Sequence, residues 1–318
     1  LIFCNFTFLF YKMRGIITKS TGSWYYVKID NTSELIPCRV RGKFRLQNYN
    51  NTNPVAVGDY VEIYVEENKN EKTGIITNIY DRKNAILRRA TKSGATYQII
   101  ATNIDGALLM ITPHHPYTPM GFIDRFIVLA EAYNVEVNLI FHKCDLYNEN
   151  DEYFNTLYNI YNQIGYKIFL TSIITNEGID ELKNYIKDKT FLLSGQSGVG
   201  KSSLINKLDS SIQIKTQELS DKYKKGRHTT TFAEMHFLSS GGAIIDTPGI
   251  KEFGIPKFEK WELGHWFREF KPFISKCKYN NCTHVNEPGC AVIAAVESGL
   301  INPLRYKNYL NILLEDLN

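Results

Sequence analysis

The stretch from Gly195 to Ser203 constrains this chain more than any other, because it fits G-x-x-x-x-G-K-[ST], the pattern of a phosphate-binding loop. The apolar residues 190–194 predict a buried strand before the loop, and residues 201–208 predict a helix after it. Glycines let the backbone turn its N–H groups toward phosphate oxygens, and the start of the helix adds the positive end of its dipole. We therefore expect the chain to bind a nucleoside triphosphate and to cleave it.

The residues of this loop have distinct expected roles. The ammonium group of Lys201 would contact the outer phosphates and hold developing charge, while the hydroxyl of Ser202 would bind Mg²⁺. The other predicted nucleotide contacts are Gly195, Gln196, Ser197, Gly198, Val199, Gly200 and Ser203. A Gly-rich turn that matches by chance is the alternative, and the strand and helix predicted on either side argue against it.

The length of 318 residues predicts two or three domains in a soluble globular protein. No apolar run approaches the roughly 20 residues of a membrane span. Residues 1–12 are apolar but lack a basic start and a cleavage site, so we interpret them as an upstream extension or disordered tail before Met13.

The six cysteines suit a reducing cytoplasm. The net charge of +4 is too small to indicate nucleic-acid binding, although basic residues cluster within 82–92 and 222–227.

Residues 13–90 show about five short alternating strands separated by turn residues. This pattern predicts a small β-barrel, with the OB-fold as the first choice and an SH3-like barrel as the second. Such barrels often bind single-stranded nucleic acid through aromatic and basic side chains, but aromatic residues also fill barrel cores. The candidate contacts are Trp24, Tyr25, Tyr26, Arg39, Arg41 and Lys43.

Residues 91–255 alternate between predicted strands and helices, which indicates a parallel sheet with ligands at the carboxyl ends of its strands. One such strand ends in His142-Lys143-Cys144-Asp145, which resembles the N-K-x-D guanine motif of GTPases. The carboxylate of Asp145 would accept hydrogen bonds from the N1 and N2 groups of guanine, and the stem of Lys143 would lie across the base. The imidazole of His142 departs from the usual Asn or Thr. After the next strand, residues 171–173, with Ser172 at their centre, would bring backbone groups to the guanine oxygen.

Two phosphate-reading segments follow the phosphate-binding loop. Residues 226–231 carry three threonines, of which we expect Thr230 to complete the magnesium shell. The D-x-x-G segment begins at Asp246, which would hold Mg²⁺ through water, and ends at Gly249, whose N–H would contact the terminal phosphate. Because the guanine-reading motifs come first in the chain, the order indicates a circularly permuted G domain.

Three cysteines and one histidine lie within fourteen residues near the C-terminus, and they suit a tetrahedral structural Zn²⁺ site. These predicted ligands are Cys277, Cys282, His284 and Cys290. Coincident buried cysteines are the alternative. The predicted fold is a multidomain α/β protein with an OB-fold barrel (13–90), a circularly permuted P-loop GTPase domain (91–255) and a helical zinc-binding domain (256–318).

The combined motifs resemble the family of ribosome small-subunit-dependent GTPases called RsgA or YjeQ. The resemblance covers nearly all of residues 13–318 and is most specific in the phosphate-binding loop, in residues 226–231 and 246–254, and in the cysteine cluster. It implies a cytoplasmic monomer that binds the small (30S) ribosomal subunit and its 16S rRNA, hydrolyses GTP to GDP with Mg²⁺ under stimulation by that subunit, and acts in late maturation of the subunit. It also implies that His228, in a G-x-H-T-T-like motif, positions the attacking water, since Ile250 after the D-x-x-G segment has no polar group.

Two other functions fit the same motifs. The first is a nucleotide-gated rRNA-binding assembly factor in which hydrolysis is incidental. The second is an ATP-dependent P-loop enzyme that carries the guanine-like motif by chance, in which case Asp145 would lose its role and ADP would compete better than GDP.

Overall fold

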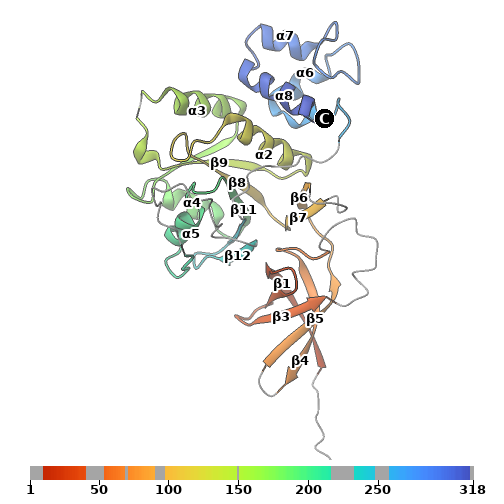
Figure 1. The fold of residues 1–318 in the computed structure, drawn as a ribbon, viewed down its shortest axis with the longest axis vertical. Helices are drawn as coiled ribbons and strands as arrows, with labels where there is room; N and C mark the ends of the chain where they lie inside the picture. The colour runs from red at the N-terminus through yellow and green to blue at the C-terminus, as the bar shows by residue number, and fades with distance from the viewer. Residues whose placement is uncertain are drawn as a thin grey trace, which may run out of the picture. The chain divides into compact units, whose positions relative to one another are not determined.

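The structure is a computed structural model that describes residues 10–40, 54–68, 71–89, 97–148, 150–215, 233–247 and 258–315. The chain divides into two compact units, which we describe separately (Figure 1). The first unit contains residues 1–105, 186–192 and 223–248, and the second contains residues 106–185, 193–222 and 249–318. Within the described residues, every helix is too short or too polar to cross a membrane.

The first unit contains a closed five-stranded barrel. Its strands are β1 (Phe10–Ser20), β2 (Tyr25–Ile29), β3 (Leu35–Val40), β4 (Tyr60–Asn68) and β5 (Glu71–Ile79). They pair in the order β1-β2-β3-β5-β4, and β1 also pairs with β4, which closes the barrel. The strand β3 runs parallel to β5, and the other pairs are antiparallel. This topology confirms the OB-like prediction over the SH3-like one.

Alternation along the strands decides which side chains fill the barrel. In β2 the side chains of Tyr25, Val27 and Ile29 are buried, whereas Tyr26 and Lys28 between them are partly exposed. Of the six nucleic-acid candidates, Tyr25 therefore belongs to the core. Arg41 and Lys43 lie outside the described residues.

The first strand begins three residues before Met13. Residues 10–12 pair with β4, where Lys12 lies opposite Tyr64, and the ammonium group of Lys12 lies 2.9 Å from Oε1 of Glu62. The barrel strand thus extends into the segment that the sequence patterns assigned to an upstream extension, because its pairing partners on β4 continue the ladder. Residues 1–9 lie outside the description.

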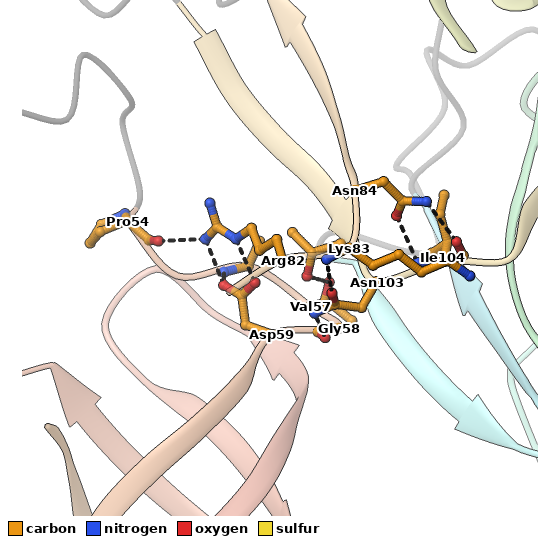
Figure 2. Close-up of polar contacts among 11 residues, drawn as sticks. Pro54, Val57, Gly58, Asp59, Arg82, Lys83, Asn84, Asn103 and Ile104 are labelled. Atoms are coloured by element: carbon orange, nitrogen blue, oxygen red, sulfur yellow. Dashed lines mark hydrogen bonds and ion pairs between the residues drawn. The ribbon is translucent and has the colours of Figure 1, made fainter. Parts of the chain in front are cut away.

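A partly buried salt bridge anchors the residues that follow the barrel (Figure 2). Asp59 is fully buried, and its two carboxylate oxygens each accept from Arg82 at 2.7 Å. A hydrogen bond lies beside this salt bridge, in which Nδ2 of Asn103 donates to the carbonyl of Gly58 at 2.8 Å. The ammonium group of Lys83 is 2.7 Å from Asp105. Two members of the first basic cluster are therefore paired with carboxylates.

Two further hairpins complete the described part of the first unit. The strands β6 (Ala85–Arg89) and β7 (Tyr97–Thr102) pair antiparallel, and the sequence patterns did not predict this hairpin. The strands β12 (Glu234–Phe237) and β13 (Ala243–Asp246) also pair antiparallel. The first of them meets the barrel, where Lys19 of β1 lies opposite Glu234 and their charged groups are 2.8 Å apart.

The second unit contains the predicted parallel sheet. The elements are β8 (Gly106–Ile111), α2 (Met120–Ala132), β9 (Val137–His142), η1 (Cys144–Leu146), α3 (Glu152–Ile164), β10 (Lys167–Thr171), α4 (Ile179–Ile186), β11 (Thr190–Gly195) and α5 (Lys201–Leu208). The last residue of α4 and residues 190–192 of β11 are counted in the first unit. The strand β9 lies between β8 and β10 and is parallel to both. Every residue of β8 and β9 is buried, as expected for strands covered on both faces.

A helical module ends the chain and packs against α2. It contains η2 (Leu263–Trp266), η3 (Arg268–Phe270), α6 (Lys271–Ile274), α7 (Ala291–Glu297) and α8 (Pro303–Glu315). Its core contains Phe267, Phe270 and Tyr309, and Val128 of α2 belongs to the same buried cluster. The apolar face of α2 thus contributes to the core of the module.

A buried ion-pair network also joins α8 to α2. The guanidinium of Arg305 is fully buried, donates to the carboxylate of Asp124, and donates to Oε1 of Glu269 at 2.6 Å. The hydroxyl of Tyr161 and the amide of Asn308 also donate to Asp124, at 2.5 and 2.6 Å. Burial opposes the charge on Arg305, but the two carboxylates outweigh burial and raise its pKa, so this side chain stays charged.

Replacing Arg305 with Met would leave Asp124 and Glu269 without their counter-charge. We expect Arg305→Met to lower the free energy of unfolding by about 3–5 kcal/mol, measured by urea denaturation. Lys307 lies on the exposed side of the same helix, so Lys307→Met should change it by less than about 0.5 kcal/mol. Equal losses in the two variants would contradict a structural role for the network.

Candidate nucleotide and metal sites

The turn between β11 and α5 has the backbone of a phosphate cradle. Gly200 has φ +112° and caps the helix that begins at Lys201. A Cβ at Gly195 would lie 2.8 Å from the carbonyl oxygen of Met110, so a larger residue would push the loop off the neighbouring strand. The ammonium group of Lys201 donates to the carbonyls of Gly195 and Gln196 at 2.9 and 3.1 Å. The side chain of Lys201 therefore folds back onto the phosphate-binding loop, where it is predicted to contact the phosphates.

The guanine-like motif lies directly after β9. Lys143 has a left-handed backbone, with φ +63°, and its ammonium group donates to the carbonyl of His115 at 2.5 Å. Asp145 lies in η1 and its side chain is exposed, which leaves the carboxylate open to solvent. Burial raises the pKa of the Cys144 thiol to about 12, so this group stays protonated.

His142 links three segments of the second unit. It lies opposite Thr171 in the parallel register of β9 and β10, and its Nδ1 lies 2.9 Å from the hydroxyl of Thr171. On its other side, a Cβ built at Gly200 would come within 2.9 Å of the imidazole ring. The imidazole is therefore packed between the ends of two strands and the phosphate-binding loop.

Ser172 organises the loop that follows β10. Its buried hydroxyl accepts from the backbone N–H groups of Ile174 and Thr175 at 3.1 and 3.2 Å. Its own N–H donates to the carbonyl of Glu177 at 3.1 Å. The N–H of Ser172 is thus engaged within the loop, and the predicted backbone contact with the base stays a prediction.

The phosphate-reading segments are described only in part. Asp246 is the last residue of β13 and is buried. His228, Thr230 and Gly249 lie outside the described residues, so their predicted roles stay predictions.

The four predicted metal ligands converge on one point of the helical module. The ligand atoms of Cys277, Cys282, His284 and Cys290 all lie within 4.8 Å of one another. The sulfurs of Cys277 and Cys290 are 3.9 Å apart, close to the roughly 3.8 Å between two thiolates on one tetrahedral Zn²⁺ and far from the roughly 2.05 Å of a disulfide. The Nδ1 atom of His284 is 3.3 Å from the sulfur of Cys290, so Nδ1 is the nitrogen that faces the thiols. The donor set and its spacing fit a bound metal ion.

The carboxylate of Glu287, which is not one of the predicted metal ligands, orders the loop of residues 283–287 through hydrogen bonds to its backbone. Oε1 of Glu287 accepts from the N–H of Thr283 at 2.7 Å, and Oε2 accepts from the N–H groups of Val285 and Asn286 at 2.9 and 3.1 Å. Burial alone would raise the pKa of Glu287, but these hydrogen bonds lower it to about 2. The loop that carries His284 therefore folds around a permanently charged group.

Sequence reasoning did not find the roles of Thr171, His115 and Glu287. The position of Thr171 after an apolar run was a usable signal, because parallel strands place their last residues side by side. The contact of Lys143 with His115 joins two loops that are far apart along the chain, so no local sequence pattern predicts it.

Comparison with known proteins decides the family. The profile described as RsgA GTPase matches residues 79–256, and the profile described as RsgA N-terminal domain matches residues 14–76. The chain belongs to the RsgA GTPase family. It is therefore a GTP-hydrolysing enzyme, and the circular permutation that the motif order predicted is a feature of this RsgA-family chain.

Individual relatives extend the likeness over nearly the whole chain. The small ribosomal subunit biogenesis GTPase RsgA of Phocaeicola vulgatus is 50% identical over 302 residues, which cover 95% of this chain and 96% of the relative. The protein of the same name from Flavobacterium psychrophilum is 48% identical and covers 96% of this chain and 93% of its own.

Two solved structures of similar proteins have the same fold. The crystal structure of YjeQ from Thermotoga maritima aligns with a TM-score of 0.76 at 36% identity and covers 97% of this chain and 99% of its own. The structure of YloQ, described as a circularly permuted GTPase, aligns with a TM-score of 0.69 at 29% identity and covers 96% and 95%.

The role of Glu287 in the metal loop can be tested by metal release. We expect Glu287→Ala to lose its bound metal to a competing chelator about ten times faster than the parent protein, because its loop loses the group that orders it. Glu297 is exposed on α7, so Glu297→Ala is the matched control and should release metal at the parental rate. Equal release from both variants would show that the ligands hold the ion without help from this carboxylate.

Proposed function

We propose that this RsgA-family GTPase binds the small ribosomal subunit and acts in its late maturation in the cytoplasm, as a monomer. The observation that carries the proposal is full-length likeness to relatives named for small ribosomal subunit biogenesis. Those relatives match 95–96% of this chain, so the barrel, the G domain and the metal module are all part of the likeness. A chain related in the G domain alone would not support this role.

The proposed substrate is GTP with Mg²⁺, and the proposed product is GDP. The backbone and side chains of the phosphate-binding loop would hold the phosphates, and Lys201 would neutralise charge that develops on the terminal phosphate. Ser202 and Thr230 would bind Mg²⁺ directly, Asp246 would hold it through water, and Gly249 would contact the terminal phosphate. The exposed carboxylate of Asp145 would select guanine.

The proposed catalytic weakness of the isolated enzyme lies in water positioning. The residue after the D-x-x-G segment is Ile250, which has no group to orient water. We assign that role to His228 in residues 226–231. Weak positioning of water predicts that the isolated protein turns over slowly and that the small subunit accelerates it.

We propose Zn²⁺ as the metal of the helical module. Three thiolates with one imidazole are the donors that Zn²⁺ prefers in closed structural sites. Burial raises the pKa of the Cys282 thiol to about 12, so the thiolate form needs a cation beside it. Bound Zn²⁺ would supply folding energy to a module whose own core is small.

We propose that the barrel contributes a contact to 16S rRNA. The exposed guanidinium of Arg39 lies 4.1 Å from the ring centre of Trp24, so a charged group and an aromatic face occur together on the outside of the barrel. Such a pair can meet a phosphate and a base at the same time. In β1, by contrast, the side chains of Lys12 and Arg14 are paired with Glu62 and Asp30, which offsets their charge.

The direct test is a GTPase assay with and without purified small subunits. We expect turnover to rise at least about tenfold when small subunits are present, because contact with the subunit would help His228 to position the attacking water. Large subunits serve as the control and should not stimulate. Equal turnover in all three samples would contradict the proposal. If Lys201→Ala abolished turnover yet supported subunit maturation in cells, the protein would instead be a nucleotide-gated binding factor with incidental hydrolysis.

If the barrel contacts rRNA, a substitution there should weaken binding to the small subunit without changing nucleotide binding. We expect Arg39→Ala to weaken binding to small subunits about threefold to tenfold, while its affinity for GDP stays unchanged. The affinity of the variant for small subunits should also fall less steeply as the salt concentration rises, because one phosphate contact is lost. Lys28→Ala, on a neighbouring strand, is a charge-matched control. The control should bind small subunits as tightly as the parent. If Arg39→Ala did so too, the rRNA contact would not involve Arg39.

A further inference from the structure

The first strand of the barrel continues past the end of its partner β4. The printed pairs of β4 with β1 reach Ile16, which lies opposite Tyr60, whereas β2 pairs with β1 as far as Ser20. One edge of β1 therefore lies beyond β4 at Lys19, and β12 pairs with β1 there, since Lys19 lies opposite Glu234. The barrel and the β12–β13 hairpin are thus joined along one strand edge.

A β-bulge turns Lys19 toward this hairpin. The register of β1 against β2 shifts between Ile17 and Lys19, so Thr18 is the extra residue of the bulge, and its hydroxyl donates to the carbonyl of Tyr26 at 3.1 Å. Ile17 is buried in the barrel, and regular alternation would place Lys19 on the same inner face. With the bulge, Lys19 leaves that face, and its ammonium group lies 2.8 Å from Oε2 of Glu234.

Glu234 also lies beside the aspartate of the D-x-x-G segment. In the pairing of β12 with β13, Glu234 lies directly opposite Asp246, which is buried at the end of β13. Directly opposed residues place their side chains on the same face of a sheet, so Lys19, Glu234 and Asp246 form one row across three strands. A lysine of the barrel is therefore two strands away from the carboxylate that would hold Mg²⁺ through water.

The ion pair fixes a hairpin that lies between the two phosphate-reading segments. The hairpin follows residues 226–231 in the chain and leads into residues 246–249. In GTPases such segments change their conformation with the terminal phosphate. Like charges directly opposite each other are unfavourable in a ladder, and the ammonium group of Lys19 offsets the charge of Glu234 beside Asp246. Both side chains of the pair are 37% exposed, so we expect it to change affinities by a few fold.

We propose that Lys19 and Glu234 are positioning residues that tie the barrel to the strand pair carrying Asp246, so that the barrel helps to hold this aspartate in place for Mg²⁺. This inference rests on the proposed function, in which Asp246 holds Mg²⁺ through water. Because coupling between two binding events is reciprocal, a partner bound to the barrel acts on the magnesium site through the same contact.

The test measures how much Mg²⁺ strengthens nucleotide binding. The probe is the imido analogue of GTP, in which nitrogen bridges the β- and γ-phosphates and prevents cleavage. Its affinity is measured in excess Mg²⁺ and in excess EDTA, and the ratio of the two affinities is the gain from the metal. In Lys19→Ala we expect this gain to fall about twofold to fivefold, while the affinity in EDTA stays unchanged. A merely structural role would lower both affinities by the same factor and leave the gain unchanged.

The direction of the change separates position from charge. Removal of the positive charge of Lys19 would by itself strengthen the attraction of this row for Mg²⁺, so a purely electrostatic effect would raise the gain. Lys19→Arg keeps the charge and should retain most of the parental gain. Glu234→Gln should lower the gain, and Lys19→Ala added to it should lower the gain no further, since the ion pair is already broken.

Lys12→Ala is the matched control, because Lys12 lies on the same strand and its ion pair with Glu62 stays within the barrel. This variant should keep the parental gain. An unchanged or raised gain in Lys19→Ala, or equal losses in Lys19→Ala and Lys12→Ala, would overturn the proposal. So would a parent protein whose affinity for the analogue does not rise with Mg²⁺. A parent protein without measurable affinity for the analogue would instead refute the proposed function on which this inference depends.

Discussion

The positive φ angle of Gly200 is the constraint on which the nucleotide site depends. At φ +112° a side chain would be strained, and the space that it would need is taken by the ring of His142. Glycine at this position lets the loop end at the first residue of α5, where the free N–H groups and the positive end of the helix dipole favour a phosphate. The phosphate cradle and the guanine motif are therefore in direct contact through one glycine and one histidine.

The parallel sheet explains why the order of the motifs along the chain is unimportant. Because β8, β9 and β10 are parallel neighbours, the loops after all three strands emerge at one edge. His142 and Thr171 end their strands in register, so the two segments predicted to read the base meet although a helix separates them in sequence. Circular permutation changes which strands are consecutive but preserves this edge, which is why the site can be built in the permuted order.

Much of this organisation could be predicted from the sequence, because it depends on local patterns. The β-barrel follows from alternation, as in β2, and the metal site follows from the spacing of Cys277, Cys282, His284 and Cys290. The partners of individual side chains could not be predicted in the same way. Tyr25 and Tyr26 are chemically alike, and the barrel decides which of them is buried. The contacts of His142 with Thr171 and Gly200 depend on register and packing across the sheet.

The central claim is that one carboxylate, that of Asp145, reads the base of a nucleotide bound by the phosphate cradle. Calorimetric titration of the parent protein and of Asp145→Asn with GDP and xanthosine diphosphate tests this most directly, because xanthine presents a carbonyl where guanine presents its amino group. The account predicts that the parent prefers GDP and that Asp145→Asn reverses the preference. If Asp145→Asn kept the parental preference for GDP, the carboxylate would not contact the base, and the assignment of this site to guanine would be wrong.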